Sequence, residues 1–463
     1  MHETLIEKIV EDKLRGVSDK EIGDKYGLSL REIEKAITKK FGVNISNLHR
    51  RKEIRTLSPK DFKLETSTVW SFKSRGNWAT HNGDYRGNWS PYIPRNVILR
   101  YSQEGDFVLD YFCGAGTTGV ECKLLNRNFI GLDINPAAIE LTKNNINFEA
   151  GKLFRDEPSV DLRIGDARDL SIITDESIDL ICAHPPYANI IHYTENNPAD
   201  LSHLDIERFL IELEKVAKES FRVTKYNKYC AILIGDMRKD KKVVPLGFRT
   251  IEKFLEAGFQ IQDLIIKRQH NCKTTGFWYN NSVKYNFLLL AHEYLVVFKK
   301  LRKDISKKEE INTVNSFSIV AHNPNIVLEG TTCWIFNHNN WYENSLINLT
   351  KRYSNNNYQI YFEPNEEIST GELLITFDYL FIANPEKVIN SLMDNVAIIC
   401  TDLKLNNHLT ESTVFKILKI VQNSGKLKIK EIIIVSLEDN KNNILDKSIK
   451  ISHKYILLFQ REK

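Results

Sequence analysis

Residues 108–118 read V-L-D-Y-F-C-G-A-G-T-T, and this stretch determines how the rest of the chain is interpreted. A short apolar run ends at Asp110, and two glycines, Gly114 and Gly116, come directly after it. A helix-compatible stretch and a second apolar run follow, and the second run ends at Asp133. A strand, a glycine turn, a helix and a strand in this order predict the first βαβ unit of a parallel sheet, and therefore an α/β fold.

The two glycines also suggest a bound nucleotide. Without a Cβ atom, Gly114 and Gly116 let the backbone pass close to a ligand. Asp133, at the end of the second strand, is placed to accept hydrogen bonds from ribose hydroxyls. Any tight turn from a strand to a helix favours glycine, however, so the pair alone leaves a purely structural interpretation open.

The composition bounds the class of protein. The chain has 463 residues, which suggests two or three domains, and its 42% hydrophobic and 27% charged residues are typical of a globular protein. No apolar run approaches the roughly 20 residues of a membrane span, and no signal-peptide pattern is present, so we expect a cytoplasmic location without membrane contact. The seven cysteines form no C-x-x-C pair, which predicts neither a disulfide framework nor a metal site. A net charge of +4 permits nucleic-acid binding without indicating it.

The N-terminal residues 3–42 predict a compact group of helices. Ser18 is placed to cap one helix, and Glu21, three residues later, completes a capping box. The last helix, over residues 30–41, is basic, and the whole resembles a helix-turn-helix that places this helix in a major groove. The candidate DNA contacts on it are Arg31, Lys35 and Lys39. The alternative is a small helical cap that packs on the main domain.

Aromatic and cationic residues alternate over residues 66–101. The aromatic members are Trp70, Trp78, Tyr85, Trp89 and Tyr92. Rings among cations suit base stacking and phosphate contact, so Arg75 and Arg86 are further candidate DNA contacts. Tryptophan-rich loops serve packing equally well, and that alternative stays open.

A third acidic strand end and a proline-rich tetrapeptide follow the glycine turn. A third predicted strand leads to Asp166, and a buried strand over 178–183 leads into His184-Pro185-Pro186-Tyr187. F-C-G-A-G-T-T followed by H-P-P-Y resembles the S-adenosylmethionine-dependent amino-methyltransferases of DNA, whose patterns are F-x-G-x-G and (D/N/S)-P-P-(Y/F/W). The resemblance spans roughly residues 66–300, with the cofactor motif first, and it implies a Rossmann-like methyltransferase sheet.

The resemblance implies a role for each matching residue. Those implied to bind S-adenosyl-L-methionine are Asp110, Phe112, Gly114, Gly116, Thr117, Asp133 and Asp166. Asp133 would hold the ribose, and Asp166 the adenine amino group. The implied catalytic residues are His184, Pro185, Pro186 and Tyr187. The first side chain and the Pro185 carbonyl would accept hydrogen bonds from the target amine, and Tyr187 would stack on a base flipped out of the duplex.

His184 departs from the family pattern, which has Asp, Asn or Ser at this position. A neutral imidazole offers one acceptor nitrogen, so it can replace a side-chain oxygen only in the correct tautomer. A protonated ring cannot accept a hydrogen bond. We therefore expect activity to fall as the pH drops through the titration of His184, unless the ring only packs and the Pro185 carbonyl suffices.

The C-terminal third repeats the catalytic part faintly. After a charged linker over 299–313, four segments keep the order of the catalytic elements: 377–385 echoes 178–185, 395–402 echoes 229–236, 424–435 echoes 257–268, and 453–459 echoes 292–298. Residues 333–336 and 359–363 would be the first two strands, with Asn337 to Asn340 replacing the glycine pair. This order predicts a degenerate second methyltransferase-like domain that binds neither cofactor nor base. An unrelated target-recognition domain is the alternative.

Together these observations predict three parts. A helix-turn-helix-like module over 1–50 precedes a catalytic domain over 60–300 and a degenerate methyltransferase-like or target-recognition domain over 315–463. The expected function is methylation of adenine N6, slightly preferred, or cytosine N4 in double-stranded DNA. By analogy with the family it serves restriction-modification beside a cognate endonuclease. An RNA amino-methyltransferase and a non-catalytic DNA-binding regulator are the alternatives. The oligomeric state stays open, since the internal duplication could replace a homodimer.

Overall fold

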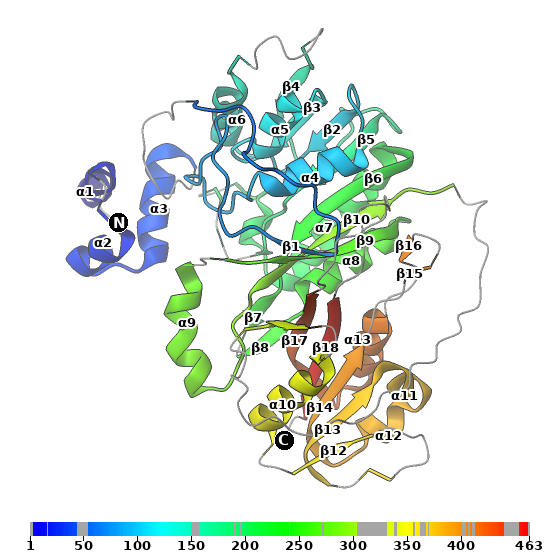
Figure 1. The fold of residues 1–463 in the computed structure, drawn as a ribbon. Helices are drawn as coiled ribbons and strands as arrows, with labels where there is room; N and C mark the ends of the chain where they lie inside the picture. The colour runs from blue at the N-terminus through cyan, green and yellow to red at the C-terminus, as the bar shows by residue number, and fades with distance from the viewer. Residues whose placement is uncertain are drawn as a thin grey trace.

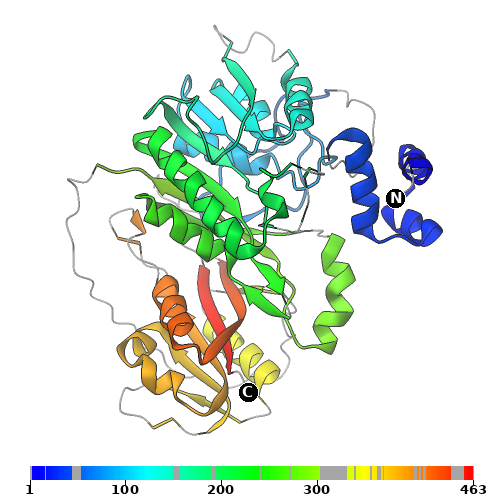
Figure 2. The ribbon, with the colours of Figure 1, turned by 180° about the vertical axis from the view of Figure 1, so that it is seen from behind.

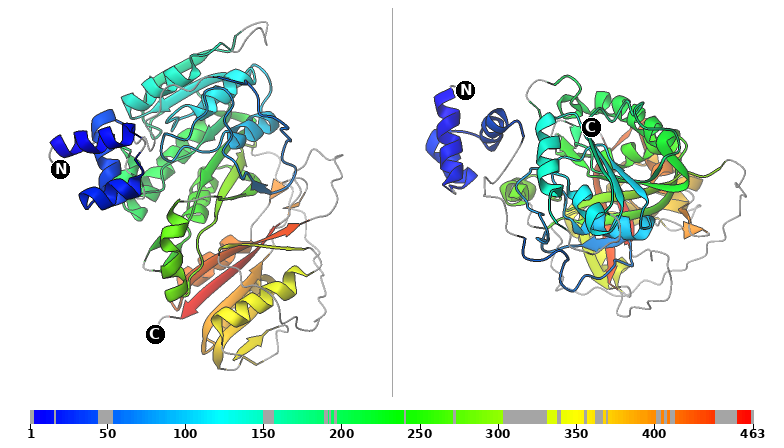
Figure 3. Two further views of the ribbon diagram at one scale, coloured as in Figure 1. Left: turned by 60° about the vertical axis from the view of Figure 1, so that its left-hand side comes forward. Right: turned by 90° about the horizontal axis from the view of Figure 1, so that it is seen from above.

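The structure, a computed structural model, describes most of the chain. The described residues are 3–15, 17–43, 54–149, 157–188, 191, 193–194, 197–239, 241–270, 273–302, 331–337, 340–354, 357–361, 367–368, 370–400, 404–405, 408–409, 413–438 and 453–461. From residue 303 on, the predicted linker lies outside them. A helical N-terminal unit lies beside a large α/β domain, and a second α/β domain lies at the opposite end (Figures 1 and 3).

The N-terminal unit has the three helices that the sequence predicts. They are α1 (Glu3–Leu14), α2 (Asp19–Tyr26) and α3 (Leu30–Phe41). The capping box of Ser18 and Glu21 is present, and Ser29 and Glu32 form a second one at the start of α3. A small apolar core holds the helices together. A hydrogen bond connects the unit to the catalytic domain. Asn135 Nδ2 donates it to the Gly42 carbonyl at 2.7 Å.

The catalytic domain is built on an eight-stranded sheet in the order β1-β9-β10-β6-β5-β2-β3-β4. Its strands are β1 (Val69–Ser71), β2 (Phe107–Asp110), β3 (Asn128–Asp133), β4 (Val160–Ile164), β5 (Ile178–Ala183), β6 (Thr224–Ile234), β9 (Gln260–Arg268) and β10 (His292–Lys299). All neighbours are parallel except β10, which lies antiparallel between β6 and β9. The predicted Rossmann-like sheet is confirmed.

Helices cover both faces of this sheet (Figures 1 and 2). They are α4 (Tyr92–Tyr101), α5 (Thr117–Leu124), α6 (Pro136–Ile146), α7 (Ile206–Val223) and α8 (Leu246–Glu256). The core under α4, α5 and α6 is separate from the one under α7 and α8. Further elements are η2 (Leu201–His203), β7 (Met237–Lys239), β8 (Lys242–Val244) and α9 (Lys273–Lys284). Because every residue of β5 is buried, its near-continuous apolar run is the sequence signature of a central parallel strand.

The tryptophans of the segment before the glycine turn lie in the packed interior. Trp70, Trp78 and Trp89 are 0%, 2% and 6% exposed, so they are not available as open stacking platforms. Trp78 Nε1 donates to the carboxylate of Glu121 on α5 at 2.6 Å, and that carboxylate also binds His81 and Arg95. The packing alternative therefore describes these tryptophans better than base stacking does.

The second domain repeats six adjacent strands of the first sheet. Its order is β11-β17-β18-β14-β13-β12, with the same alternation of parallel and antiparallel neighbours as β1-β9-β10-β6-β5-β2. The strands are β11 (Cys333–Asn337), β12 (Tyr358–Ile360), β13 (Gly371–Phe377), β14 (Met393–Cys400), β17 (Leu427–Glu438) and β18 (His453–Arg461). The helices are α10 (Trp341–Tyr353), α11 (Asp378–Ala383), α12 (Pro385–Ile389) and α13 (Thr413–Ser424), and β15 (Lys404–Leu405) pairs with β16 (His408–Leu409). The predicted second α/β domain is confirmed.

Three of the predicted echoes are wrong in detail. The strand predicted over 359–363 as the second of its sheet corresponds instead to β2, because β12 lies beside β13 at that position. Residues 377–385 do not form the counterpart of β5, because α11 and α12 occupy them and β13 ends at Phe377. A short apolar run does not distinguish helix from strand by its periodicity, which explains the error. The strand over 333–336 is also not the counterpart of the glycine strand, because β11 lies at the β1 position beside β17. The shared pattern T-x-W-x-F at 68–72 and 332–336 is the sequence signal for this correspondence.

The second domain lacks counterparts of β3 and β4. Only residues 361–370 separate β12 from β13, whereas residues 111–177 separate β2 from β5. Ten residues cannot hold the two strands and two helices that carry Asp133 and Asp166 in the first domain. What remains are the six strands that correspond to β1, β9, β10, β6, β5 and β2.

The two domains meet through a reciprocal pair of hydrogen bonds. Thr68, just before β1, contacts His453 Nδ1 of β18 at 2.8 Å. Thr332, just before β11, contacts His292 Nδ1 of β10 at 2.8 Å. Corresponding residues thus exchange partners across the boundary, which is the signature of a two-fold symmetric contact. The chain holds within itself the kind of interface that a homodimer would form.

The reciprocal contacts predict matched losses of stability. Thr68→Val and Thr332→Val each keep the side-chain shape and remove a buried hydrogen bond to a histidine. Thr332→Val also removes the acceptor of the Ala291 N–H, so its loss should be the larger of the two. Each should lower the free energy of unfolding by about 1–3 kcal/mol, measured from the urea midpoint of the full chain. Thr250→Val is the control, because the Thr250 hydroxyl is buried without a hydrogen-bond partner among the described residues. A threonine variant as stable as this control would contradict the prediction.

Candidate functional site

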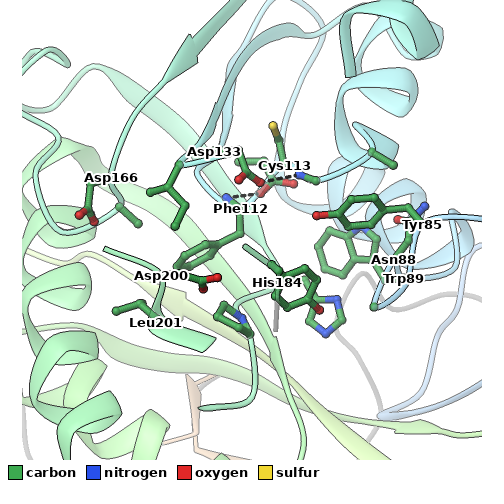
Figure 4. A pocket seen from close by; sticks show the side chains of 18 of the residues that line it. Tyr85, Asn88, Trp89, Phe112, Cys113, Asp133, Asp166, His184, Asp200 and Leu201 are labelled. Carbon is green, nitrogen blue, oxygen red and sulfur yellow. Dashed lines mark hydrogen bonds between the residues drawn. The ribbon is translucent and has the colours of Figure 1, made fainter. Parts of the chain in front are cut away.

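A pocket opens at the carboxyl ends of β2, β3, β4 and β5 (Figure 4). This is the edge where ligands bind in open α/β sheets. The predicted residues that line it are Asp110, Phe112, Gly114, Asp133, Asp166, His184 and Pro186. The structure therefore brings the glycine turn and the first part of the tetrapeptide, about 70 residues apart in sequence, into one cavity.

The glycine turn is shaped by positive φ angles. Gly114 and Gly116 have φ of 51° and 76°, a region that residues with a Cβ atom adopt only under strain. A Cβ on Gly114 would lie 2.9 Å from Tyr85 Cε1, and one on Gly116 would lie 2.7 Å from Thr142 Cγ2. Both positions need glycine, but only Gly114 lines the pocket, while Gly116 allows α5 to pack on α6.

Two carboxylates, the buried Asp110 and the half-buried Asp133, hold the turn in place. Asp133 accepts hydrogen bonds from the backbone N–H groups of Gly114 and Asn135 at 3.0 and 2.9 Å. Asp110 accepts from Thr118 Oγ1 at 2.6 Å and from the Phe112 N–H at 3.0 Å. Burial raises the pKa of Asp110 to about 7 and that of Asp133 to about 6. Both carboxylates thus favour a ligand that brings hydroxyl donors or positive charge into the pocket.

The remaining cofactor candidates have local partners. Asp166 receives hydrogen bonds from the Arg168 guanidinium, the shortest at 2.6 Å, which orient its carboxylate at the pocket wall. Thr117, at the start of α5, does not line the pocket and instead donates to Asn88 Oδ1 at 2.6 Å. Thr117 therefore acts on the pocket through Asn88, which does line it.

The tetrapeptide 184–187 divides its residues between the pocket and the interior. His184 and Pro186 line the pocket, while Pro185 and Tyr187 do not. The His184 ring stacks on Trp89 with ring centroids 5.5 Å apart, and its Nε2 lies 2.9 Å from the Tyr187 hydroxyl. Because the Tyr187 hydroxyl also donates to Glu293 Oε1 at 2.8 Å, its ring is anchored toward β10. Stacking of Tyr187 on a flipped base stays a prediction.

The environment of His184 changes its expected titration. Burial lowers the pKa of His184 to about 4, because a charged ring is unfavourable away from water. The ring therefore stays neutral, and able to accept a hydrogen bond, well below the ordinary range of histidine. The fall in activity that the sequence predicts should accordingly occur near pH 4, below the ordinary titration range of histidine.

Sequence reasoning missed several residues of the pocket. They are Tyr85, Asn88, Trp89, Tyr193 and Asp200. Tyr85, Asn88 and Trp89 come from the aromatic segment, whose interleaved rings and polar groups were the available signal. Asp200 gave no such signal, because its place depends on how the chain after the tetrapeptide folds back.

Two predicted DNA contacts have structural partners. Arg75 is largely buried and donates to the backbone carbonyls of Asn82, Asn88 and Trp89. Burial lowers its pKa to about 10. This geometry favours a role in shaping the pocket wall over contact with phosphate. Arg86 forms an ion pair with Glu34 of α3, which joins the helical unit to the same wall.

The basic face of α3 remains accessible. Lys35 and Lys39 are exposed, one turn apart on this helix, as a DNA-reading helix requires. The side chain of Arg31 lies outside the described residues. Among the helices that the structure describes, none combines the length and apolar composition needed to cross a membrane.

Comparisons with known proteins agree with this site. A family model described as DNA methylase matches residues 22–144, and one described as methyltransferase domain matches residues 102–257. The type II methyltransferase M.BglI of Bacillus subtilis is 32% identical over 126 residues, which cover 25% of this chain and 36% of that protein. M.HpaI of Haemophilus parainfluenzae is 40% identical over 84 residues, covering 18% and 26%. The resemblance to the S-adenosylmethionine-dependent DNA amino-methyltransferases is confirmed.

A tRNA methyltransferase and a solved methyltransferase structure also match parts of the chain. A tRNA (guanine(10)-N2)-dimethyltransferase of Methanothermobacter thermautotrophicus is 34% identical over 104 residues, 22% of this chain and 29% of that protein. Among solved structures, an S-adenosylmethionine-dependent methyltransferase of Methanosarcina mazei is 18% identical, with a TM-score of 0.31, covering 44% of this chain and 97% of that chain. The chain spans 36% of the length of M.BglI and 26% of that of M.HpaI.

The glycine turn predicts a selective loss of ligand binding. Gly114→Ala adds a Cβ that clashes with Tyr85 inside the pocket, so the affinity for S-adenosylmethionine, measured by calorimetry, should fall at least about tenfold. Gly105→Ala is the matched control, because Gly105 also has a positive φ, of 80°, but a Cβ there meets open space. Equal affinities of the two variants would show that the space at Gly114 does not hold the ligand.

Proposed function

We propose that this protein transfers a methyl group from S-adenosylmethionine to an exocyclic amine of a DNA base. The observation that carries the proposal is the meeting of the glycine turn and the H-P-P-Y tetrapeptide in one pocket. The matches to a DNA methylase model and to type II methyltransferases support it. Adenine N6 is our first choice of target and cytosine N4 the second, since both amines share the geometry that the tetrapeptide serves.

The pocket residues fit the proposed cofactor. The Asp133 carboxylate would hold the ribose hydroxyls, Asp166 would accept from the adenine amino group, and the Gly114 backbone would lie against the methionine moiety. S-adenosylmethionine would supply an electrophilic methyl group on a sulfonium, which an amine nitrogen attacks as the carbon–sulfur bond breaks.

The chain's own residues would position the amine. The nitrogen lone pair of an aromatic amine is delocalised into the ring, so two acceptors are needed to turn it toward the methyl carbon. His184 and the Pro185 carbonyl would be these acceptors, and the amine then loses one proton to solvent. Because the pKa of His184 is lowered to about 4, the ring keeps a lone pair throughout the neutral range.

The other parts of the chain fit DNA as the substrate. We propose that α3 lies on the duplex through Lys35 and Lys39, and that the second domain serves as a built-in partner rather than a second catalyst. A restriction endonuclease partner and a cytoplasmic location are proposals from the family alone.

Mass spectrometry of nucleosides tests the reaction directly. DNA incubated with the protein and S-adenosylmethionine should yield N6-methyladenine or N4-methylcytosine. His184→Ala should lower the rate about a hundredfold, whereas His184→Asn, which restores an amide oxygen acceptor, should retain more activity. Parallel reactions on tRNA test the alternative substrate. Methylated guanosine or adenosine in RNA, with none in DNA, would refute the proposal.

The basic face of α3 predicts a selective effect on DNA binding. Lys35→Ala with Lys39→Ala should raise the KM for DNA at least about tenfold and flatten its dependence on salt. The affinity for S-adenosylmethionine should not change. Lys20→Ala, an exposed lysine on α2, is the control and should match the unaltered protein. An unchanged KM in the double variant would indicate that the helical unit is only a cap.

A further inference from the structure

Behind the pocket, four side chains form a continuous hydrogen-bonded chain. His184 Nε2 lies 2.9 Å from the Tyr187 hydroxyl, which donates to Glu293 Oε1 at 2.8 Å. Lys267 Nζ donates to the other oxygen of the same carboxylate, Glu293 Oε2, at 2.7 Å. Lys267 and Glu293 are direct partners in the β9–β10 register, so the sheet itself fixes this ion pair.

The charges in this chain of contacts are well defined. Glu293 is 7% exposed, and although burial alone would raise its pKa, Lys267 brings the pKa down to about 2. The carboxylate is therefore ionised and accepts hydrogen bonds only. The charged groups that act on His184 are Glu293, Lys267 and Arg75, and none of them outweighs the burial that keeps the ring neutral.

An ionised Glu293 determines the direction of every bond in the chain. Tyr187 has one proton, and it goes to the carboxylate. The bond between Tyr187 and His184 must then be donated by the ring, so Nε2 carries the proton. In a neutral imidazole this leaves Nδ1 as the acceptor, which is the property that the proposed amine contact requires. The Gly87 backbone also hydrogen-bonds this ring and raises its pKa, so the Glu293–Tyr187 pair must outweigh that contact.

We propose that Glu293 is a positioning residue that acts through Tyr187 to hold His184 in the Nε2-protonated tautomer, with Nδ1 as the acceptor for the target amine. This inference rests on the proposed function. It also explains how histidine replaces the Asp, Asn or Ser of the family pattern, because those residues need no second group to present an oxygen.

The second domain lacks counterparts of the Glu293 carboxylate and the Lys267 ammonium group. By strand register, Lys454 of β18 takes the place of Glu293, and Val435 of β17 takes the place of Lys267. The neighbouring histidine and tyrosine are kept, as His453 and Tyr455. The carboxylate is thus absent from the domain that has also lost the cofactor strands, as expected if it serves the catalytic site alone.

Glu293→Gln tests the proposal, because it should reverse the donor and acceptor in each hydrogen bond between residue 293, Tyr187 and His184. Lys267 is a donor, so it will bind the amide oxygen and turn the amide N–H2 toward Tyr187. Tyr187 then donates to His184 Nε2, and the ring proton moves to Nδ1. Nitrogen NMR of protein labelled at histidine, with His184 assigned by loss of its signal in His184→Asn, should show this tautomer switch without DNA or cofactor.

The kinetic effect should be confined to the chemical step. In Glu293→Gln, kcat should fall about tenfold to a hundredfold, while the KM for S-adenosylmethionine stays unchanged because Glu293 does not line the pocket. Tyr187→Phe removes the linking hydroxyl and should produce a similar loss, and the two changes together should cost little more than either one.

Asp263→Asn is the matched control. Asp263 is a buried carboxylate on β9 that accepts from the Tyr101 hydroxyl at 2.9 Å, and neither residue lines the pocket. It should alter neither the His184 signal nor kcat. A proton on Nδ1 in the unaltered protein, drawn there by the adjoining Gly87 backbone, or an unchanged tautomer in both Glu293→Gln and Tyr187→Phe, would overturn the proposal. The NMR result stands even if the DNA shows no methylation, so the two proposals fail separately.

Discussion

The hydrogen bond from the Gly114 N–H to the Asp133 carboxylate joins the glycine turn to the acidic end of β3, and the shape of the pocket depends on it. It connects the turn after β2 to the end of β3, so the backbone conformation of the turn is set before any ligand arrives. The same carboxylate accepts the Asn135 N–H and so also fixes the start of α6. Asn135 in turn holds the Gly42 carbonyl of the helical unit. The pocket, its helices and the N-terminal unit therefore share one small group of polar contacts.

The sequence predicted the parts of the fold that are determined locally. The alternation of apolar runs, glycines and acids placed β2, β3 and β5 and their order, and the capping box placed α2, because each depends on residues close in sequence. Prediction failed where contacts between residues far apart in the sequence determine the structure. Residues 378–383 suit a strand by composition but form α11, and β11 joins the far edge of its sheet. Likewise, nothing near His184 in sequence indicated that Glu293, more than 100 residues later, would reach its neighbour Tyr187.

The repeat shows which strands of a methyltransferase sheet can be lost. The second domain keeps the counterparts of β1, β9 and β10, which carry the reciprocal contacts between Thr68 and His453 and between Thr332 and His292. It lacks counterparts of β3 and β4, whose carboxyl ends border the pocket in the first domain. These two strands lie at the edge of the sheet away from β1, β9 and β10, so their loss leaves the interface intact.

The interface and the proposed tautomer control occupy the same strand. On β10, His292 contacts Thr332 of the second domain, and the next residue, Glu293, binds Tyr187 and Lys267. Because successive side chains of a strand point to opposite faces, a single short segment can be held by the second domain on one face and orient the tetrapeptide on the other. A shift of β10 would disturb both sets of bonds at once. This coupling gives a physical reason for the first domain to retain a partner that lacks the counterparts of β3 and β4.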